Sequence, residues 1–205
     1  MSGSTALVVI DPYNDFISEG GKLWPYAREV AERVGLVPNL KRLVEAAREA
    51  EIQIVFAPHH RFDEGDFEAF RFVNPTHAGA VRVRPFTRGT WGAEFHPDFT
   101  VQRSDVVVQE HWMHSAFAGT DLDYQLRMRG IDRIAICGMR TNACVEATAR
   151  WGVELGYHVT IVKDATAAFS WEEWVATIET NARGYAHAIV ATPEAIAAWK
   201  ANAAV

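Results

Sequence analysis

The chain has 205 residues, of which 49% are hydrophobic and 22% charged, a composition typical of one folded domain and not of a disordered or fibrous chain. With 20 basic against 26 acidic residues, the formal net charge is −6, so we expect neither a nucleic-acid partner nor binding to an anionic membrane surface. Apolar runs are shorter than the roughly 18–20 residues of a membrane-spanning helix, and the first residues lack the pattern of a signal peptide. We therefore expect a cytoplasmic protein.

Apolar strand-like runs alternate with helical patterns along the chain. In chain order, we predict a strand at 5–11, a helix at 38–50, strands at 52–57 and 105–110, a helix at 120–129, a strand at 133–138, a helix at 143–155, a strand at 157–164, a helix at 171–182, a strand at 186–191 and a helix at 193–201. Buried strands separated by helices favour parallel pairing with right-handed crossovers. The pattern predicts a three-layer α/β/α fold with a six-stranded parallel sheet.

Residues 58–104 form the one long irregular stretch of the sequence. The chain shows no repeat, low-complexity tract or linker, so we interpret residues 1–205 as a single domain. Long loops in compact domains usually carry function or a small subdomain. We therefore expect this insertion to be a lid over the site or a contact between copies of the chain.

Cys144 is the predicted nucleophile. Ligands of open α/β sheets bind beyond the carboxyl ends of the strands, and Cys144 follows the strand at 133–138 through the loop GMRTNA. A helix N-terminus lowers the pKa of a thiol, and its N–H groups can hold an oxyanion. The alternative is that Cys144 is a small apolar filler. Cys137, inside that strand, is interpreted as inert core, and two cysteines are too few for a disulfide framework.

Asp11 and His111 also follow predicted strands. Asp11 can take a proton from the thiol and deliver it to a leaving amine, unless it is a turn aspartate before Pro12. His111 can be a cation beside the thiolate or a neutral base, although a lone histidine is more often structural. If the strand continues, Glu110 points to the opposite face, and only one of the two side chains reaches the site.

Five aromatic residues near the strand ends are candidates for a substrate pocket, and each is about as well explained as core or interface filler: Tyr13, Phe16, Trp91, Trp112 and Phe117. The histidines of the 58–104 stretch lack the spacing of a metal site. Glycine-rich phosphate loops are absent from the sequence as well. We therefore expect neither a metal nor another cofactor, and a small molecule as substrate.

Three segments together resemble the isochorismatase-like cysteine hydrolases, a superfamily that includes nicotinamidases, N-carbamoylsarcosine amidohydrolases and ureidoacrylate amidohydrolases. These segments are residues 8–16 (VVIDPYNDF), 115–150 (SAFAGTDLDYQLRMRGIDRIAICGMRTNACVEATAR) and 156–169 (GYHVTIVKDATAAF). The resemblance covers nearly the whole chain. It implies a six-stranded parallel sheet between helices, a homo-oligomer, and a triad of Asp, Lys and Cys.

In that pattern Asp11 and Cys144 stand at the aspartate and cysteine positions. The resemblance also implies a cis peptide bond between Met139 and Arg140, and an oxyanion held by the backbone N–H groups of Arg140 and Cys144. The family lysine lies four residues before the serine that is Ser115 here, and this position is His111.

The chain has no lysine between residues 42 and 162, so the triad reads Asp11, His111 and Cys144, with Lys22 as the alternative third member. A protonated histidine can supply part of the charge of a lysine. Position 58 is proline where the nicotinamidase metal motif has an acid, so the resemblance gives no reason to expect a metal.

The predicted function is that of a cysteine hydrolase that cleaves the C–N bond of a small amide or carbamoyl compound through a thiolate nucleophile and an acyl-enzyme. Two alternatives remain. One is a vinyl-ether hydrolase of the isochorismatase kind, which relies on the aspartate. The other is a catalytically weak family member that serves as a binding or assembly module, an interpretation motivated by the absent lysine.

Overall fold

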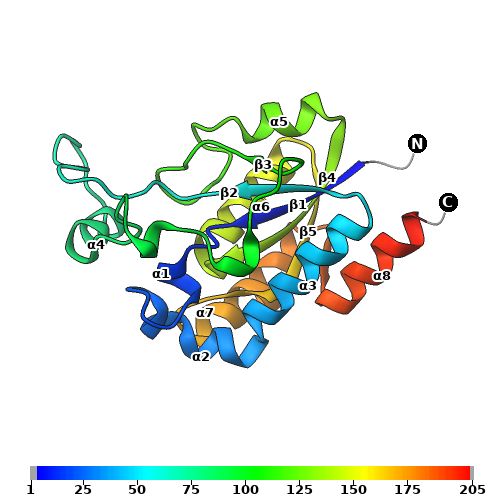
Figure 1. Cartoon of the computed structure of the whole chain (residues 1–205), viewed down its shortest axis with the longest axis horizontal. Helices are drawn as coiled ribbons and strands as arrows, with labels where there is room; N and C mark the ends of the chain where they lie inside the picture. The colour runs from blue at the N-terminus through cyan, green and yellow to red at the C-terminus, as the bar shows by residue number, and fades with distance from the viewer. Residues whose placement is uncertain (1–3, 204–205) are drawn as a thin grey trace.

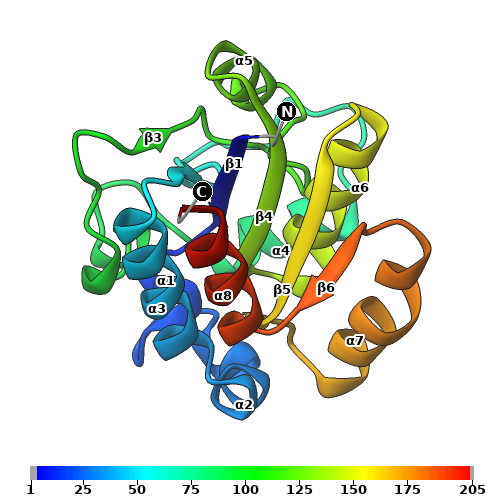
Figure 2. The ribbon, with the colours of Figure 1, turned by 90° about the vertical axis from the view of Figure 1, so that its right-hand side faces the viewer.

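Six strands form a single sheet in the computed structural model, which describes residues 4–203. The strands are β1 (Ser4–Ile10), β2 (Gln53–Ala57), β3 (Val106–Val107), β4 (Ile131–Met139), β5 (His158–Ala167) and β6 (Ala188–Val190). Their order across the sheet is β3-β2-β1-β4-β5-β6, and every neighbouring pair is parallel, as Figures 1 and 2 show. The predicted six-stranded parallel sheet is confirmed.

Helices cover both faces of this sheet (Figure 2). They are α1 (Asn14–Ile17), α2 (Trp24–Val34), α3 (Leu36–Glu49), α4 (Pro75–Val83), α5 (Leu122–Met128), α6 (Glu146–Glu154), α7 (Trp171–Val175) and α8 (Thr192–Ala203). Helices α3 and α8 pack together on one side, and α5 and α6 lie on the other. Because both faces are covered, residues 6–10 of the central strand β1 are fully buried. No helix within residues 4–203 is long and apolar enough to cross a membrane.

Three helices were missed by the sequence analysis: α1, α2 and α4. Helix α2 buries only Ala27, Val30 and Ala31, so small residues hide its apolar stripe. Helix α4 buries no residue at all and therefore has no apolar periodicity to detect. The predicted helix at 171–182 is regular only in α7, and a wider π-helical turn, Ala176–Asn181, continues it.

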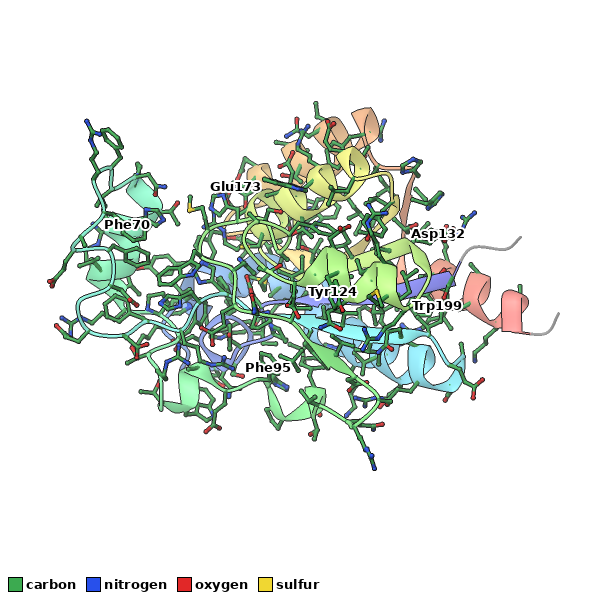
Figure 3. All side chains as sticks on the ribbon, turned by 90° about the horizontal axis from the view of Figure 1, so that it is seen from above. Phe70, Phe95, Tyr124, Asp132, Glu173 and Trp199 are labelled. Carbon is green, nitrogen blue, oxygen red and sulfur yellow. The ribbon has the colours of Figure 1, made fainter. Side chains whose placement is uncertain are left out.

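The 58–104 segment holds α4 and two short 3₁₀ turns, Trp91–Ala93 and Pro97–Phe99. Part of it projects from the body of the protein at the left of Figure 1. Figure 3 shows Phe70 on this projection, far from Trp199 of helix α8.

The carboxyl ends of β1 and β4 approach each other closely beneath the site. A Cβ atom on Gly138 would lie 2.0 Å from the carbonyl oxygen of Ile10, and Gly138 has φ of +106°. Only glycine fits both the space and this backbone conformation. The close approach brings the residue after β1 near the turn that follows β4.

Candidate active site

Backbone pairing beyond the strand ends positions Asp11 and His111. The N–H of Asp11 donates to Ala57 O at 3.2 Å, and Asp11 has φ of +51°, a left-handed conformation that aspartate tolerates better than most residues. The regular part of β3 ends at Val107, but the chain stays paired with the residues after β2. There the N–H of His111 donates to Pro58 O at 2.9 Å, and His111 O accepts from the N–H of His60 at 2.8 Å.

Cys144 lies in a π-helical turn, Thr141–Val145, between β4 and α6. This turn places its sulfur beside the other two side chains. The ligand atoms of Asp11, His111 and Cys144 all lie within 4.8 Å of one another, and all three residues are buried. The structure therefore brings together the three residues that the sequence placed in one triad.

The imidazole of His111 faces two hydrogen-bond acceptors. Its Nε2 lies 3.1 Å from Oδ1 of Asp11, and its Nδ1 lies 3.3 Å from the carbonyl oxygen of Met113. A carboxylate and a carbonyl oxygen only accept, so both hydrogen bonds form together only when both ring nitrogens carry protons. Both side chains of the His111–Asp11 pair have 0% exposure. The geometry therefore suits an imidazolium ion next to a buried carboxylate.

The second carboxylate oxygen of Asp11 has a different environment. Oδ2 is buried and has no hydrogen-bond partner within the described part of the chain. A buried acceptor without a partner is costly, so such an atom is poised to take a proton. The Cys144 thiol lies next to this carboxylate and can supply that proton.

Burial, followed by the negative charge of Asp11, raises the pKa of the Cys144 thiol well above its usual range. The N–H and the charge of Arg140 act in the opposite direction without reversing the effect. The expectation that the helix N-terminus lowers this pKa is therefore wrong. The thiol is buried and faces a carboxylate, and both effects disfavour the thiolate. Cys144 rests as a neutral thiol.

A cavity of about 430 Å³ opens onto Cys144. This volume suits a small molecule. Its apolar lining comes from the residues Phe16, Leu23, Tyr26, Pro75, Gly79, Ala80, Val83, Pro85, Phe86, Ala143 and Phe169, and its polar lining from His59, Thr76, Arg82, His114 and Arg140. Helix α4 supplies a large part of the wall, so the segment at 58–104 borders the cavity.

Of the five predicted aromatic pocket residues, only Phe16 is among those that line the cavity. Tyr13 lies behind the wall, with its hydroxyl donating to His59 O at 2.8 Å. The ring of Trp112 stacks on His60 at 3.7 Å, and Phe117 stacks on Tyr157 at 5.6 Å. Trp91 is exposed. The prediction that these four residues line the pocket is corrected by their packing elsewhere.

Most of the actual wall was missed by sequence reasoning. Phe86 and the α4 residues come from the irregular insertion, where no periodic pattern points to a site. His114 and Phe169 were within reach, because both belong to segments close to predicted site residues or within the family resemblance.

Glu110 and Lys22 make their contacts away from the triad. Glu110 forms ion pairs with Arg61 and Arg88. Burial alone would raise the pKa of Glu110, but hydrogen bonds from Arg61 and Arg88 lower it to about 2. The ammonium of Lys22 is exposed and donates to Arg84 O and to the hydroxyl of Thr87. The side chains of Glu110 and His111 thus point to opposite sides of the extended segment, as the alternation of side chains along a strand predicts.

Arg140 follows a cis peptide bond to Met139, as the resemblance implies. Its backbone N–H acts to lower the pKa of the Cys144 thiol, whose sulfur lies 3.9 Å from the carbonyl oxygen of Met113. Within residues 4–203, Asp11, His111 and Cys144 are also the one group of three or more His, Cys, Asp or Glu side chains whose ligand atoms lie close enough together to share a metal ion. A metal there would have to replace the proton between His111 and Asp11.

Known proteins resemble this chain over most of its length. The family model of the isochorismatase domain matches residues 5–194. The isochorismatase family protein YwoC of Bacillus subtilis is 37% identical over 85% of this chain and 83% of its own. The ureidoacrylate amidohydrolase RutB of Pantoea ananatis is 31% identical over 79% of this chain and 68% of its own. The solved structure of a cysteine hydrolase from Pseudomonas syringae has a TM-score of 0.80 and 28% identity, over 96% of this chain and 92% of its own. The chain therefore belongs to the isochorismatase family.

Proposed function

We propose that the protein is a cysteine amidohydrolase that cleaves the C–N bond of a small amide or carbamoyl compound. The observation that carries this proposal is the unpartnered carboxylate oxygen of Asp11 beside the neutral thiol of Cys144, at the wall of a cavity of small-molecule size. The similarity to a ureidoacrylate amidohydrolase supports an amide-like substrate over other hydrolysable bonds.

In the first half of the proposed reaction, Asp11 takes the proton of Cys144 while the sulfur attacks the carbonyl carbon. The oxygen that becomes negative is held by the backbone N–H groups of Arg140 and Cys144. The tetrahedral intermediate collapses when protonated Asp11 donates its proton to the nitrogen. Ammonia or an amine leaves, and the acyl group remains on sulfur as a thioester.

In the second half, water enters the cavity and gives a proton to Asp11 as its oxygen attacks the thioester carbonyl. The C–S bond breaks, the proton returns from Asp11 to sulfur, and the acid or carbamic acid departs. Asp11 therefore serves as base and acid in turn, and its Oδ2 is the atom through which each proton passes.

His111 takes the place of the family lysine in this scheme. As an imidazolium, it neutralises the buried charge of Asp11 through the 3.1 Å contact and remains protonated through the cycle. Its ring is held by the Met113 carbonyl and by the backbone pairing of His111 with Pro58 and His60. The histidine thus supplies a fixed positive charge where the family pattern has a flexible one.

We propose that the 58–104 segment covers the site and also contacts another copy of the chain in a homo-oligomer. Helix α4 lines the cavity without burying any of its own residues in this chain. On the same segment, Phe72 is 79% exposed, and Phe70 and Val73 are exposed beside it. Exposed apolar groups of this kind commonly mark contacts between proteins.

The test is an ammonia-release screen of primary amides, N-carbamoyl amino acids and ureido acids, with the wild type and Cys144→Ala in parallel. At least one compound should release ammonia with the wild type only, and EDTA should leave the rate unchanged. Release that persists in Cys144→Ala would contradict the thiol mechanism and favour amide hydrolysis that relies on Asp11 without the cysteine. A screen with no turnover would contradict the amidohydrolase proposal and favour the vinyl-ether hydrolase or the binding module.

A further inference from the structure

Two arginines line the cavity without an acidic partner. Arg140 and Arg82 both border it, and neither forms an ion pair with an Asp or Glu in the part of the chain that the structure describes. Eight other arginines do form such pairs. A guanidinium is always charged and prefers a carboxylate or phosphate as its partner. These two unpaired positive charges therefore favour the binding of an anion in the cavity.

The remaining lining residues do not offset the positive charge of the two arginines. No Asp or Glu is among the residues that line the cavity. Burial lowers the pKa of His59 to about 4, and burial together with the charge of Arg140 lowers the pKa of His114. Both imidazoles are therefore neutral at pH 7, and the permanent charges of the lining are the two guanidinium groups. A low-dielectric cavity of this kind attracts anions.

Arg140 is the arginine that is held in place. Its guanidinium carbon lies 4.0 Å above the ring of Phe169, another lining residue. Stacking fixes the plane of the guanidinium and leaves its edge free for a carboxylate, which it can bind through two parallel hydrogen bonds. Arg82, in contrast, is exposed on helix α4.

Arg140 also lies close to the reacting atoms. It lines the same cavity as Cys144 and His114, and its charge acts on the pKa of both. An anion on its guanidinium would therefore belong to the same small molecule whose carbonyl carbon meets the thiol. The apolar side chains of Phe16, Leu23 and Phe86 would contact the rest of that molecule.

We propose that Arg140 binds a carboxylate of the substrate, so that the protein acts on small amides or carbamoyl compounds that carry an acid group on an apolar body. This inference rests on the proposed amidohydrolase function for its kinetic consequences. The subsite itself does not depend on turnover, because a carboxylate can bind whether or not an amide is cleaved.

The kinetic experiment compares N-carbamoyl amino acids with their methyl esters in the wild type, Arg140→Met, Arg140→Lys and Arg82→Met. A hydrogen-bonded ion pair is worth about 10–100-fold in kcat/KM, so Arg140→Met should lose that factor for the acid, mainly through KM. The ratio of acid to ester turnover should fall by the same factor in Arg140→Met, because any general effect on the thiol is common to both substrates, and Arg140→Lys should recover part of the preference for the acid. The matched control, Arg82→Met, should retain the preference for the acid.

The binding experiment needs no turnover and uses benzoate and benzamide as probes in calorimetry with the intact protein. The wild type should bind benzoate more tightly than benzamide, and Arg140→Met should lose this difference while Arg82→Met keeps it. If no amide is hydrolysed but benzoate binding depends on Arg140, the proposed function fails and the carboxylate subsite stands. Benzoate binding that is unchanged in Arg140→Met, or lost in Arg82→Met instead, would overturn the assignment.

Discussion

The two cysteines of the chain differ in the features that the proposed mechanism requires of its nucleophile. Both are free and buried, and burial raises the pKa of both. Cys137 lies within strand β4, where its sulfur contacts Val8 O at 3.7 Å. Cys144 lies just past the end of the same strand, at a cavity wall and beside Asp11. Cys144 therefore differs from Cys137 in bordering the cavity and in having a carboxylate beside it, and not in having a lowered thiol pKa.

The resting state of Cys144 differs from the one expected of a thiol at a helix start. A thiol at the start of a helix is expected to be a ready thiolate. Burial and the charge of Asp11 instead keep Cys144 a neutral thiol at rest, and in the proposed mechanism it is activated only when a substrate fills the cavity and Asp11 receives the proton. The carboxylate of Asp11 helps to raise the pKa of the Cys144 thiol in the resting protein, and in the proposed mechanism the same carboxylate accepts the thiol proton.

Replacement of Cys144 gives the largest expected effect. Cys144→Ala should reduce hydrolysis of any amide found in the screen by roughly 10⁴-fold or more, because covalent catalysis ends with its nucleophile. Steady-state ammonia release measures the loss, and circular dichroism checks the fold. If Cys144→Ala kept activity within threefold of the wild type, Cys144 would have no more catalytic role than Cys137.

Asp11→Asn should lower turnover by about 10²–10⁴-fold, since it removes the proton acceptor and donor. Asparagine also tolerates the left-handed backbone of this position, so the loop conformation should persist. Turnover numbers and thermal unfolding are measured together. A fall in activity explained entirely by unfolding would assign Asp11 a structural role.

His111→Gln should lower turnover by about 10–100-fold, because it keeps a hydrogen-bond donor but removes the positive charge that the proposed mechanism places beside Asp11. His111→Lys should retain activity, since it restores both the charge and the family pattern. Lys22→Ala is the control and should stay within threefold of the wild type, because its contacts lie at the exposed Arg84 and Thr87. If His111→Gln is fully active and Lys22→Ala inactive, the third triad member has been misassigned.

Cys137→Ala should have the smallest effect. Removing one buried sulfur costs about 1 kcal/mol of unfolding free energy, and hydrolysis should change less than threefold. Chemical denaturation and ammonia release measure the two quantities. A large loss of activity at unchanged stability would show that the strand thiol takes part in the reaction.

The sheet and the three triad residues were accessible from sequence because they obey simple periodic rules. Each strand is an apolar run, and Asp11, His111 and Cys144 follow such runs at the edge where parallel strands end. The cavity wall was not accessible in this way. Helix α4 buries nothing in its own chain, and Trp112 turns away from its neighbour His111 to stack on His60.

The raised pKa of Cys144 also could not be predicted from the sequence. The pKa shift depends on how deeply the thiol is buried and on the distance to Asp11, a residue far away in the chain. Local position at a helix start predicts the opposite direction. Burial and the charge of a residue far away in the chain therefore determine the pKa of Cys144, and the local sequence around the helix start does not reveal them.

The most direct test of this account is iodoacetamide labelling of the native protein across a pH series, with each cysteine followed by peptide mass spectrometry. Cys144 should be labelled and Cys137 protected at every pH. Because the pKa of Cys144 is raised, its labelling should accelerate as the pH rises through and beyond the usual thiol range. Asp11→Asn removes a negative charge that raises this pKa, so at pH 8 it should label faster while it turns over more slowly. Equal, slow labelling of both cysteines, or slower labelling of Cys144 in Asp11→Asn, would contradict the account.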